Sequence, residues 1–258
     1  MQFKDKSVVV TGGSKGIGKA IALAFAEQGA KVAISARNQA ELDAAAAEIE
    51  SAGGQALAVV CDVTDDQQVA ELAAKVTAAF DVVDILVNNA GIAASHKFLD
   101  HPDKLWHKVL DVNLTGVYRV CKAFVPAMVA RKSGRIINMA SVASKIASPY
   151  MAAYTTSKHG LLGLTRSLAV ELNPFNITVN AICPGYVDTP MVEGAIAYVT
   201  AKTGQTPDDA RKVIESTNPQ KRLIDAAEVA ALTLMLAGEA ARSITGQAIN
   251  VDGGAVMW

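Results

Sequence analysis

The chain has 258 residues, of which 51% are hydrophobic, and its 24 basic and 25 acidic residues leave a formal net charge of −1. This balance gives no reason to expect a nucleic acid or an anionic membrane as partner. No apolar run approaches the roughly 20 residues that span a bilayer, and the first residues lack the pattern of a secretory signal. The three widely spaced cysteines predict no disulfide framework and no metal site, but free thiols in a reducing cytoplasm.

Strand-like and helix-like segments alternate from one end of the chain to the other. Strands are expected at residues 7–11, 31–35, 55–60, 84–87, 135–139, 176–182 and 247–251, and helices at 18–28, 39–52, 69–79, 103–131, 152–172 and 226–237. Several strands are continuous apolar runs, such as Val8-Val9-Val10, which is typical of parallel strands covered on both faces. Pro126 is expected to kink or interrupt the helix at 103–131.

This alternation predicts an α/β fold in which residues 1–258 form one doubly wound dinucleotide-binding and catalytic domain. Its sheet is expected to be mostly or wholly parallel, with about seven strands and helices on both faces.

The segment at about 185–219 breaks the alternation, because it is long and rich in Gly, Pro and Thr. Connections of this length inside a compact domain are usually functional. We therefore expect a substrate lid with short helices of its own, mobile without ligand. Within it, Ile196, Tyr198 and Val199 are the side chains expected to face the substrate.

A glycine-rich turn, Thr11-Gly12-Gly13-Ser14-Lys15-Gly16-Ile17-Gly18, lies between the first strand and the first helix. Glycines there let the backbone turn tightly and approach a phosphate, and the amides at the helix start can then hold a pyrophosphate. The turn therefore predicts a dinucleotide cofactor.

The end of the second strand indicates which dinucleotide. A carboxylate there would bind the 2′-hydroxyl of NAD, but the sequence has Ala36 followed by Arg37. A guanidinium suits a phosphate, and Lys15 in the glycine turn could reach the same group. The residues therefore predict NADP(H) as the preferred cofactor, with NAD(H) as the alternative. Asp62, after the third strand, is placed to accept a hydrogen bond from the adenine amino group.

Tyr154 and Lys158 are four residues apart, so they share one face of the helix expected at 152–172. A phenol titrates near pH 10 in water, which is too high for efficient acid–base catalysis at neutral pH. An adjacent ammonium stabilises the phenolate, so the pattern predicts a Tyr154 with a lowered pKa.

Taken together, these residues resemble the short-chain dehydrogenase/reductase family, in its branch of about 250 residues. The resemblance covers essentially the whole chain and rests on motifs in family order: Thr11–Gly18, Asn88-Asn89-Ala90-Gly91, Asn113, Ser141, Tyr154, Lys158, Pro184-Gly185 and Val251-Asp252-Gly253-Gly254. Lys15 and Arg37 also match the members that prefer NADP.

The resemblance implies a role for each catalytic residue. Tyr154 would give a proton to the carbonyl oxygen during reduction and take it back during oxidation. Ser141 would hold that oxygen, Lys158 would also bind the nicotinamide ribose, and Asn113 would hold a water that links Lys158 to solvent. The implied cofactor-binding residues are Gly12, Ser14, Lys15, Gly16, Ile17, Gly18, Arg37, Asp62, Val63, Asn89, Ala90, Gly91, Tyr154, Lys158, Pro184, Gly185, Val187 and Thr189.

The family also suggests a homotetramer, in which the helices at 103–131 and 152–172 pack against a neighbour. A cofactor-sensing protein without catalysis is the remote alternative from another functional class. The complete set of catalytic residues favours an enzyme.

The substrate is expected to be a small-molecule ketone or alcohol. The region around the catalytic residues looks like 3-oxoacyl thioester reductases, polyketide ketoreductases and 3-hydroxybutyrate dehydrogenases. The hydroxybutyrate enzymes usually bind a carboxylate through a His and a Lys at positions that are Ala143 and Met151 here. Because a buried carboxylate without such partners is costly, we expect a 3-oxoacyl thioester or a related ketone. The alternative is an alicyclic, aromatic or steroid-type alcohol. Candidate substrate contacts are Ala93, Ala143, Met151, Tyr186 and Met191.

Overall fold

The computed structural model describes residues 1–258, and its centre is a seven-stranded sheet. The strands are β1 (Ser7–Thr11), β2 (Lys31–Ala36), β3 (Gln55–Val60), β4 (Ile85–Asn88), β5 (Gly134–Met139), β6 (Ile177–Pro184) and β7 (Ala248–Val251). They pair in the order β3-β2-β1-β4-β5-β6-β7, and every pair is parallel. The predicted doubly wound parallel sheet is confirmed.

Nine α-helices accompany the sheet: α1 (Gly16–Glu27), α2 (Gln39–Ser51), α3 (Asp66–Phe80), α4 (Asp103–Leu110), α5 (Gly116–Ala130), α6 (Ala152–Leu172), α7 (Pro190–Thr203), α8 (Pro207–Ser216) and α9 (Ala226–Ala237). Side chains of Asn38, Asp65 and Asp225 cap the amino ends of α2, α3 and α9, as expected for residues that satisfy free helix amides. No helix is long and apolar enough to cross a membrane.

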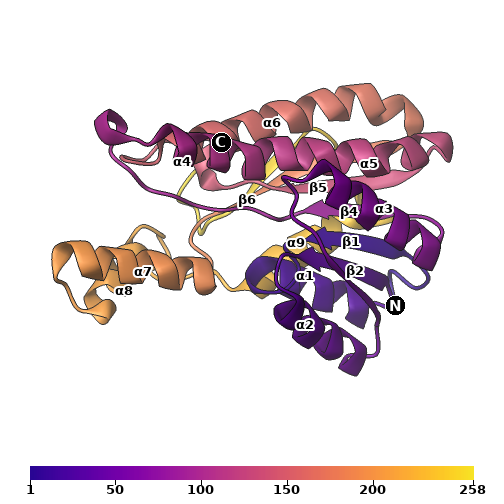
Figure 1. The fold of residues 1–258 in the computed structure, drawn as a ribbon, viewed down its shortest axis with the longest axis horizontal. Helices are drawn as coiled ribbons and strands as arrows, with labels where there is room; N and C mark the ends of the chain where they lie inside the picture. The colour runs from indigo at the N-terminus through magenta and orange to yellow at the C-terminus, as the bar shows by residue number, and fades with distance from the viewer.

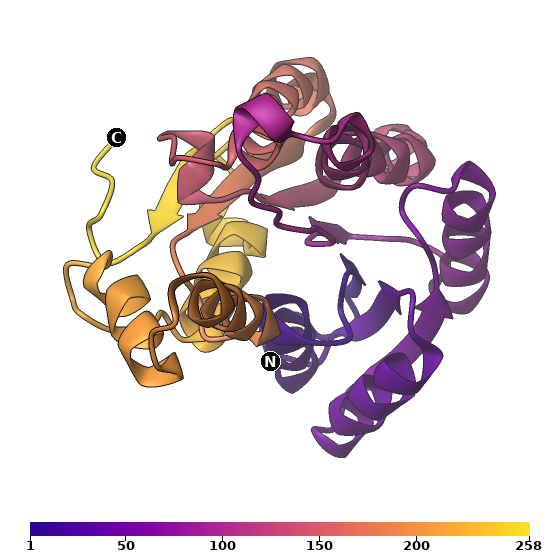
Figure 2. The same ribbon diagram turned by 60° about the vertical axis from the view of Figure 1, so that its left-hand side comes forward.

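The sheet separates two hydrophobic cores (Figures 1 and 2). On one face, α3, α5 and α6 bury side chains such as Leu72, Phe124 and Leu161. On the other face, α1, α2 and α9 bury side chains such as Phe25 and Leu42. Strands β1, β4, β5 and β6 are buried along their whole lengths, which explains why their sequences are apolar on both faces.

The helical stretch at 103–131 is interrupted, but not where the sequence predicted. A short π-helix at Asp111–Thr115 separates α4 from α5, whereas α5 continues through Pro126 to Ala130. The expectation that Pro126 would mark the break was therefore wrong. A π-helical turn accommodates an extra residue and is frequent at functional sites, and this one contains the fully buried Asn113.

The 185–219 segment holds α7 and α8, which stand to one side of the sheet at the left of Figure 1. Four of their apolar side chains, Val192, Ile196, Ala210 and Ile214, form a small buried cluster with Leu223, which lies beyond the segment. Ile196 and Val199 pack in this helix-to-helix contact, so the expectation that they face a substrate is not met. The reason is that the apolar face of α7 packs against α8, and this contact between the two helices was not predicted from the sequence. Tyr198 is 49% exposed.

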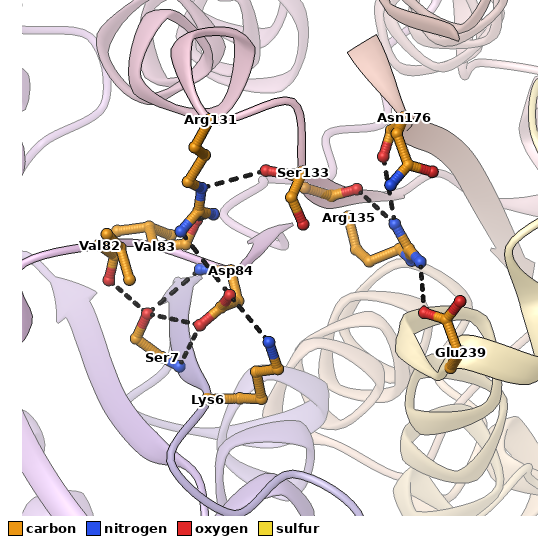
Figure 3. A network of polar contacts seen from close by, with 11 residues as sticks. Lys6, Ser7, Val82, Val83, Asp84, Arg131, Ser133, Arg135, Asn176 and Glu239 are labelled. Atoms are coloured by element: carbon orange, nitrogen blue, oxygen red, sulfur yellow. Dashed lines mark hydrogen bonds and ion pairs between the residues drawn. The ribbon is translucent and has the colours of Figure 1, made fainter.

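A polar network ties the amino ends of the central strands together (Figure 3). The Asp84 carboxylate accepts a hydrogen bond from the Ser7 amide at 3.0 Å and lies 3.3 Å from the Lys6 ammonium. Arg131, at the end of α5, lies 3.7 Å from the same carboxylate. This network joins β1 and β4 at the sheet edge opposite the carboxyl ends of the strands.

We expect Asp84→Asn to lower the free energy of unfolding by roughly 1–3 kcal/mol. The half-buried Asp84 carboxylate accepts from the Ser7 amide and pairs with Lys6, whereas an Asn side chain has no charge and replaces one acceptor oxygen by a donor NH2 group. Urea unfolding monitored by circular dichroism measures this change. Asp81→Asn is the matched control, because the Asp81 side chain makes no hydrogen bond or ion pair and Asn tolerates its left-handed backbone. An equal loss in both variants would contradict the assigned role of the network.

Candidate active site

The predicted site residues gather where the carboxyl ends of the strands meet. β1 pairs with β2 on one side and with β4 on the other, so the chain winds in opposite directions from β1. In open parallel sheets, a ligand binds at such a switch point, outside the carboxyl ends of the strands. The turns after β1 and β4 lie at this switch point, and those after β5 and β6 follow along the same edge.

The glycine turn has the shape that a dinucleotide phosphate needs. Gly12 and Gly16 have left-handed φ values of 65° and 55°. A Cβ on Gly12 would lie 2.9 Å from the Ala90 Cα, and one on Gly18 would lie 2.2 Å from the Gly12 carbonyl oxygen. Only glycine fits these positions. Helix α1 starts with no side-chain cap and no acidic residue in its first turn, so its free amides suit a pyrophosphate.

Hydrogen bonds lock the turn after β4 onto the turn after β1. Asn89 Nδ2 donates to the carbonyl oxygens of Thr11 and Gly12 at 3.0 Å each. In return, the Thr11 hydroxyl oxygen accepts from the amides of Asn89 and Ala90, at 3.0 and 3.1 Å. Thr11 was not among the residues predicted to hold the site together. Its position as the last residue of the first strand, directly before the glycines, is the signal that could have found it.

The adenosine end carries the predicted basic residues, and each has an acidic partner. Arg37 lies 4.0 Å from Asp62 and its side chain is 65% exposed. Asp62 also accepts hydrogen bonds from the amide and hydroxyl of Thr64, so it stabilises its own turn. Lys15 lies 2.9 Å from Glu41 in α2. Glu41 was not among the predicted residues, because its position depends on how α2 packs against α1.

Val63, also predicted to bind cofactor, is buried, and a Cβ on Gly116 would come within 2.8 Å of it. This close packing shows Val63 in contact with the start of α5, at the turn that also holds Asp62.

Tyr154 and Lys158 lie in the first two turns of α6, next to Ser141, which follows β5 and caps a short 3-10 helix at Val142–Ser144. Burial raises the pKa of the Tyr154 phenol, and the hydrogen bond with Ser141 partly opposes this. The expected lowering of the Tyr154 pKa below the ordinary phenol value is therefore wrong for this structure, because the effect of burial is the larger one. Lys158 Nζ lies 5.8 Å from the centre of the Tyr154 ring and donates to the Met139 carbonyl oxygen at 2.7 Å.

Burial also lowers the pKa of the Lys158 ammonium to about 8. Both groups are thus shifted toward their neutral forms by the same apolar surroundings. At neutral pH the phenol keeps its proton, so it is a hydrogen-bond donor in the cleft beside the sheet edge.

Asn113, in the π-helical turn, joins the segment after β4 to the start of α6. Its Oδ1 accepts from the Ile92 amide at 2.8 Å, while its Nδ2 donates to the Ile92 carbonyl oxygen and to Ser157 Oγ, at 2.9 and 3.1 Å. Ser157 Oγ in turn donates to the Tyr154 carbonyl oxygen at 2.7 Å. Both Nδ2 hydrogens are therefore used within the protein, so a water at Asn113 would have to bind one of its oxygen atoms. Ser157 was not among the predicted residues, although it directly precedes Lys158.

Gly91 lies where the cofactor side and the catalytic side meet. A Cβ there would lie 3.3 Å from Asn113 Oδ1 and 3.7 Å from Lys158 Nζ. Its closeness to Lys158 makes the turn after β4 part of both halves of the site.

The residues predicted to hold the nicotinamide follow β6. Pro184 ends this strand, Val187 is buried, and Thr189 donates from its hydroxyl to the Val187 carbonyl oxygen at 3.0 Å. A Cβ on Gly16 would lie 3.2 Å from the Thr189 side chain. The start of the 185–219 segment therefore contacts the glycine turn, far away in the sequence.

The candidate substrate residues differ in their exposure to solvent. Ala143 and Met151 are half-buried, whereas Ala93, Tyr186 and Met191 are exposed. A surface groove of about 490 Å³ lies on the outer side of the α6 start and is lined by His96, Phe98, Ala147, Ser148, Pro149, Tyr150, Ala152, Thr155 and Thr156. Tyr150, next to the candidate substrate contact Met151, is among its lining residues, but none of the catalytic residues is, so we do not assign the groove to the reaction.

Comparison with known proteins agrees with this arrangement. A family model described as enoyl-(acyl carrier protein) reductase matches residues 12–256. A D-beta-hydroxybutyrate dehydrogenase of Rhizobium meliloti is 37% identical over 252 residues, which are 96% of this chain and 98% of the relative. A 3-oxoacyl-(acyl-carrier-protein) reductase of Thermotoga maritima is 36% identical over the whole of both chains.

Among solved structures, a substituted actinorhodin polyketide ketoreductase with NADPH is 36% identical, covers 100% of this chain and 99% of its own, and superposes with a TM-score of 0.96. Likeness of this extent, in a family model, in full-length relatives and in the fold, shows that the chain belongs to the short-chain dehydrogenase/reductase family of oxidoreductases.

Proposed function

We propose that the protein is an NADP(H)-dependent ketoreductase that interconverts a ketone and a secondary alcohol, with a 3-oxoacyl thioester or a related ketone as substrate. The observation that carries the proposal is the placement of a protonated, half-buried Tyr154 beside Ser141 and Lys158, at the same sheet edge as the glycine turn. Similar proteins named 3-oxoacyl reductase and polyketide ketoreductase support the substrate class.

The proposed chemistry divides the site between cofactor and protein. NADPH supplies the hydride when it is bound. Tyr154 gives its phenolic proton to the carbonyl oxygen, and Ser141 hydrogen-bonds that oxygen and orients it. Lys158 binds the nicotinamide ribose and stabilises the phenolate that remains, while Asn113 holds the α6 start in place through Ser157. Because the phenol carries its proton at neutral pH, Tyr154 is in the form needed to act as the acid when a ketone is reduced.

The proposed cofactor contacts follow the same edge. The glycine turn with Ser14 and Ile17 would hold the pyrophosphate, and Asn89 to Gly91 would line the adenosine side. Val187 and Thr189 would hold the nicotinamide. Arg37 and Lys15 would bind the 2′-phosphate.

The substrate side is proposed to be apolar. Ala143 and Met151 stand where a carboxylate-binding enzyme would place polar or basic groups, and a carboxylate buried there would remain unpaired. A ketone on a longer or thioester-linked chain avoids this cost. The similarity to a hydroxybutyrate dehydrogenase keeps a small hydroxy acid among the compounds to be tested. An alicyclic, aromatic or steroid-type alcohol is the second candidate.

A homotetramer built through α4–α5 and α6 also stays a proposal. Its support is the exposure of large apolar side chains on these helices, Tyr118 on α5 and Val170 on α6.

A reduction screen tests the function. Purified protein is offered NADPH or NADH with acetoacetyl thioesters, free acetoacetate, diketones, cyclic ketones and steroids, and nicotinamide absorbance is followed. We expect the highest kcat/KM for a thioester with NADPH, and little turnover of free acetoacetate. Efficient turnover of acetoacetate would contradict the substrate proposal, and equal efficiency with both cofactors would contradict the cofactor proposal.

The Arg37→Asp variant extends the screen. Loss of a charge-assisted contact costs roughly 1.5–3 kcal/mol, so the preference for NADPH should fall by about tenfold to a hundredfold. Arg242→Asp, at an exposed position after α9 and outside the helices of the proposed tetramer interface, is a control for the change of charge alone.

Replacement of Tyr154 by Phe should abolish turnover while leaving the dissociation constant for NADPH nearly unchanged, because the ring remains and only the proton donor is removed. Stopped assays measure turnover, and NADPH fluorescence measures binding. Tyr118→Phe, on the exposed face of α5, serves as the matched control with parental activity. A Tyr154→Phe enzyme that retained a substantial share of the parental rate would show that another group moves the proton.

The segment at 185–219 is proposed to close over the substrate. Its helices are held mainly by the five-residue cluster and by a short parallel bridge between Val187 and Ile224, so local opening should need little free energy. We expect hydrogen exchange at 190–215 to slow when NADP(H) and substrate are both bound, because closure would exclude water from the site. Slow exchange in the free protein that does not change on binding would argue for a preformed pocket instead.

A further inference from the structure

Glu41 occupies the space between the two residues of the glycine turn that face the adenosine end. Its carboxylate oxygens lie 2.9 Å from Lys15 Nζ and 3.1 Å from Ser14 Oγ. Lys15 has no other ion pair. The pKa of the Glu41 carboxyl is lowered, first by the hydrogen bond from Lys15, so this carboxyl is ionised at neutral pH.

The position of Glu41 follows from the start of α2. Arg37 leaves the end of β2, Asn38 caps the helix by accepting a hydrogen bond from the Glu41 amide at 3.2 Å, and Glu41 lies in the first turn. Because α1 and α2 pack side by side on the same face of the sheet (Figure 1), this first turn faces the glycine turn. Glu41 therefore places a carboxylate beside the glycine turn, although β2 itself ends in Ala36 and not in an acidic residue.

We propose that Glu41 is a specificity-determining residue for the cofactor, which limits the preference for NADP(H) over NAD(H) by occupying Lys15 and by repelling the 2′-phosphate. This inference rests on the proposed use of a nicotinamide dinucleotide.

The physical argument concerns a difference between two ligands. A phosphate monoester carries a charge of about −1.5 to −2 at neutral pH. To reach Lys15, it has to displace the Glu41 carboxylate and then remain close to it. The 2′-hydroxyl of NAD is uncharged and neither competes for Lys15 nor is repelled. A carboxylate at this place therefore penalises one cofactor and spares the other.

The alternative is that the ion pair between Lys15 and Glu41 only holds the start of α1 against α2 and has no effect on cofactor binding. A second pair between these helices provides the comparison, because Lys19 Nζ lies 3.0 Å from Glu48, which is two helical turns along α2 from Glu41. Glu48→Gln removes a similar helix-to-helix pair outside the proposed site, so it is the matched control.

The experiment measures dissociation constants for NADPH and NADH by fluorescence titration of the parent, Glu41→Gln and Glu48→Gln. We expect Glu41→Gln to bind NADPH about fivefold more tightly, as removal of a competing exposed charge allows, with NADH changed less than twofold. Glu48→Gln should leave both constants unchanged. Unchanged or weaker NADPH binding by a folded Glu41→Gln protein, or an equal gain for both cofactors, would overturn the proposal.

Adenosine 2′,5′-bisphosphate and AMP, titrated by calorimetry, separate this inference from the proposed reaction, because neither needs catalysis. The gain from Glu41→Gln should appear with the bisphosphate alone. In a Lys15→Met background the gain should shrink, since Glu41 then has no lysine to occupy; a gain of full size there would show that Glu41 does not act through Lys15. If the parent protein binds both probes but turns over no ketone, the proposed reaction is wrong, while the proposed role of Glu41 in cofactor binding is unaffected.

Discussion

The site depends on the close approach of two backbone turns, one after β1 and one after β4. Asn89 and Thr11 join them by reciprocal hydrogen bonds, and the glycines at 12 and 18 leave room for the contact. Parallel pairing of β1 with β4 brings both turns to one edge of the sheet. The same pairing is tied at its other end by the Asp84 network, so the register that aligns the turns is held from both sides.

Burial is the main electrostatic influence on the candidate catalytic pair. Ser141, Tyr154 and Lys158 lie at the end of a wholly buried strand and in the helix packed on it, so the charged forms of both ionisable groups are disfavoured. A tyrosine kept protonated in this way is suited to give a proton. The π-helical turn at Asn113 contributes by holding Ser157, and through it the start of α6, against the turn after β4.

The two ends of the proposed cofactor site differ in character. The catalytic end is apolar and buried, whereas the adenosine end is exposed and charged, with each basic residue beside an acid. Exposed ion pairs contribute little to the free energy of folding. A phosphate that binds Lys15 or Arg37 nevertheless has to displace the carboxylate paired with that residue. Cofactor choice can therefore vary through surface charges such as Glu41 without disturbing the buried pair that is proposed to move the proton.

The sequence by itself determined the doubly wound parallel sheet, because continuous apolar strands alternating with amphipathic helices can bury both faces in few other ways. It also indicated the glycine turn and the helical spacing of Tyr154 and Lys158, which are local patterns. Only the tertiary structure decided that burial raises the pKa of Tyr154, that Ile196 packs against α8 and that Glu41 reaches Lys15. Each of these depends on a neighbour from another element, and neither periodicity nor motif spacing encodes the distance between side chains on separate helices.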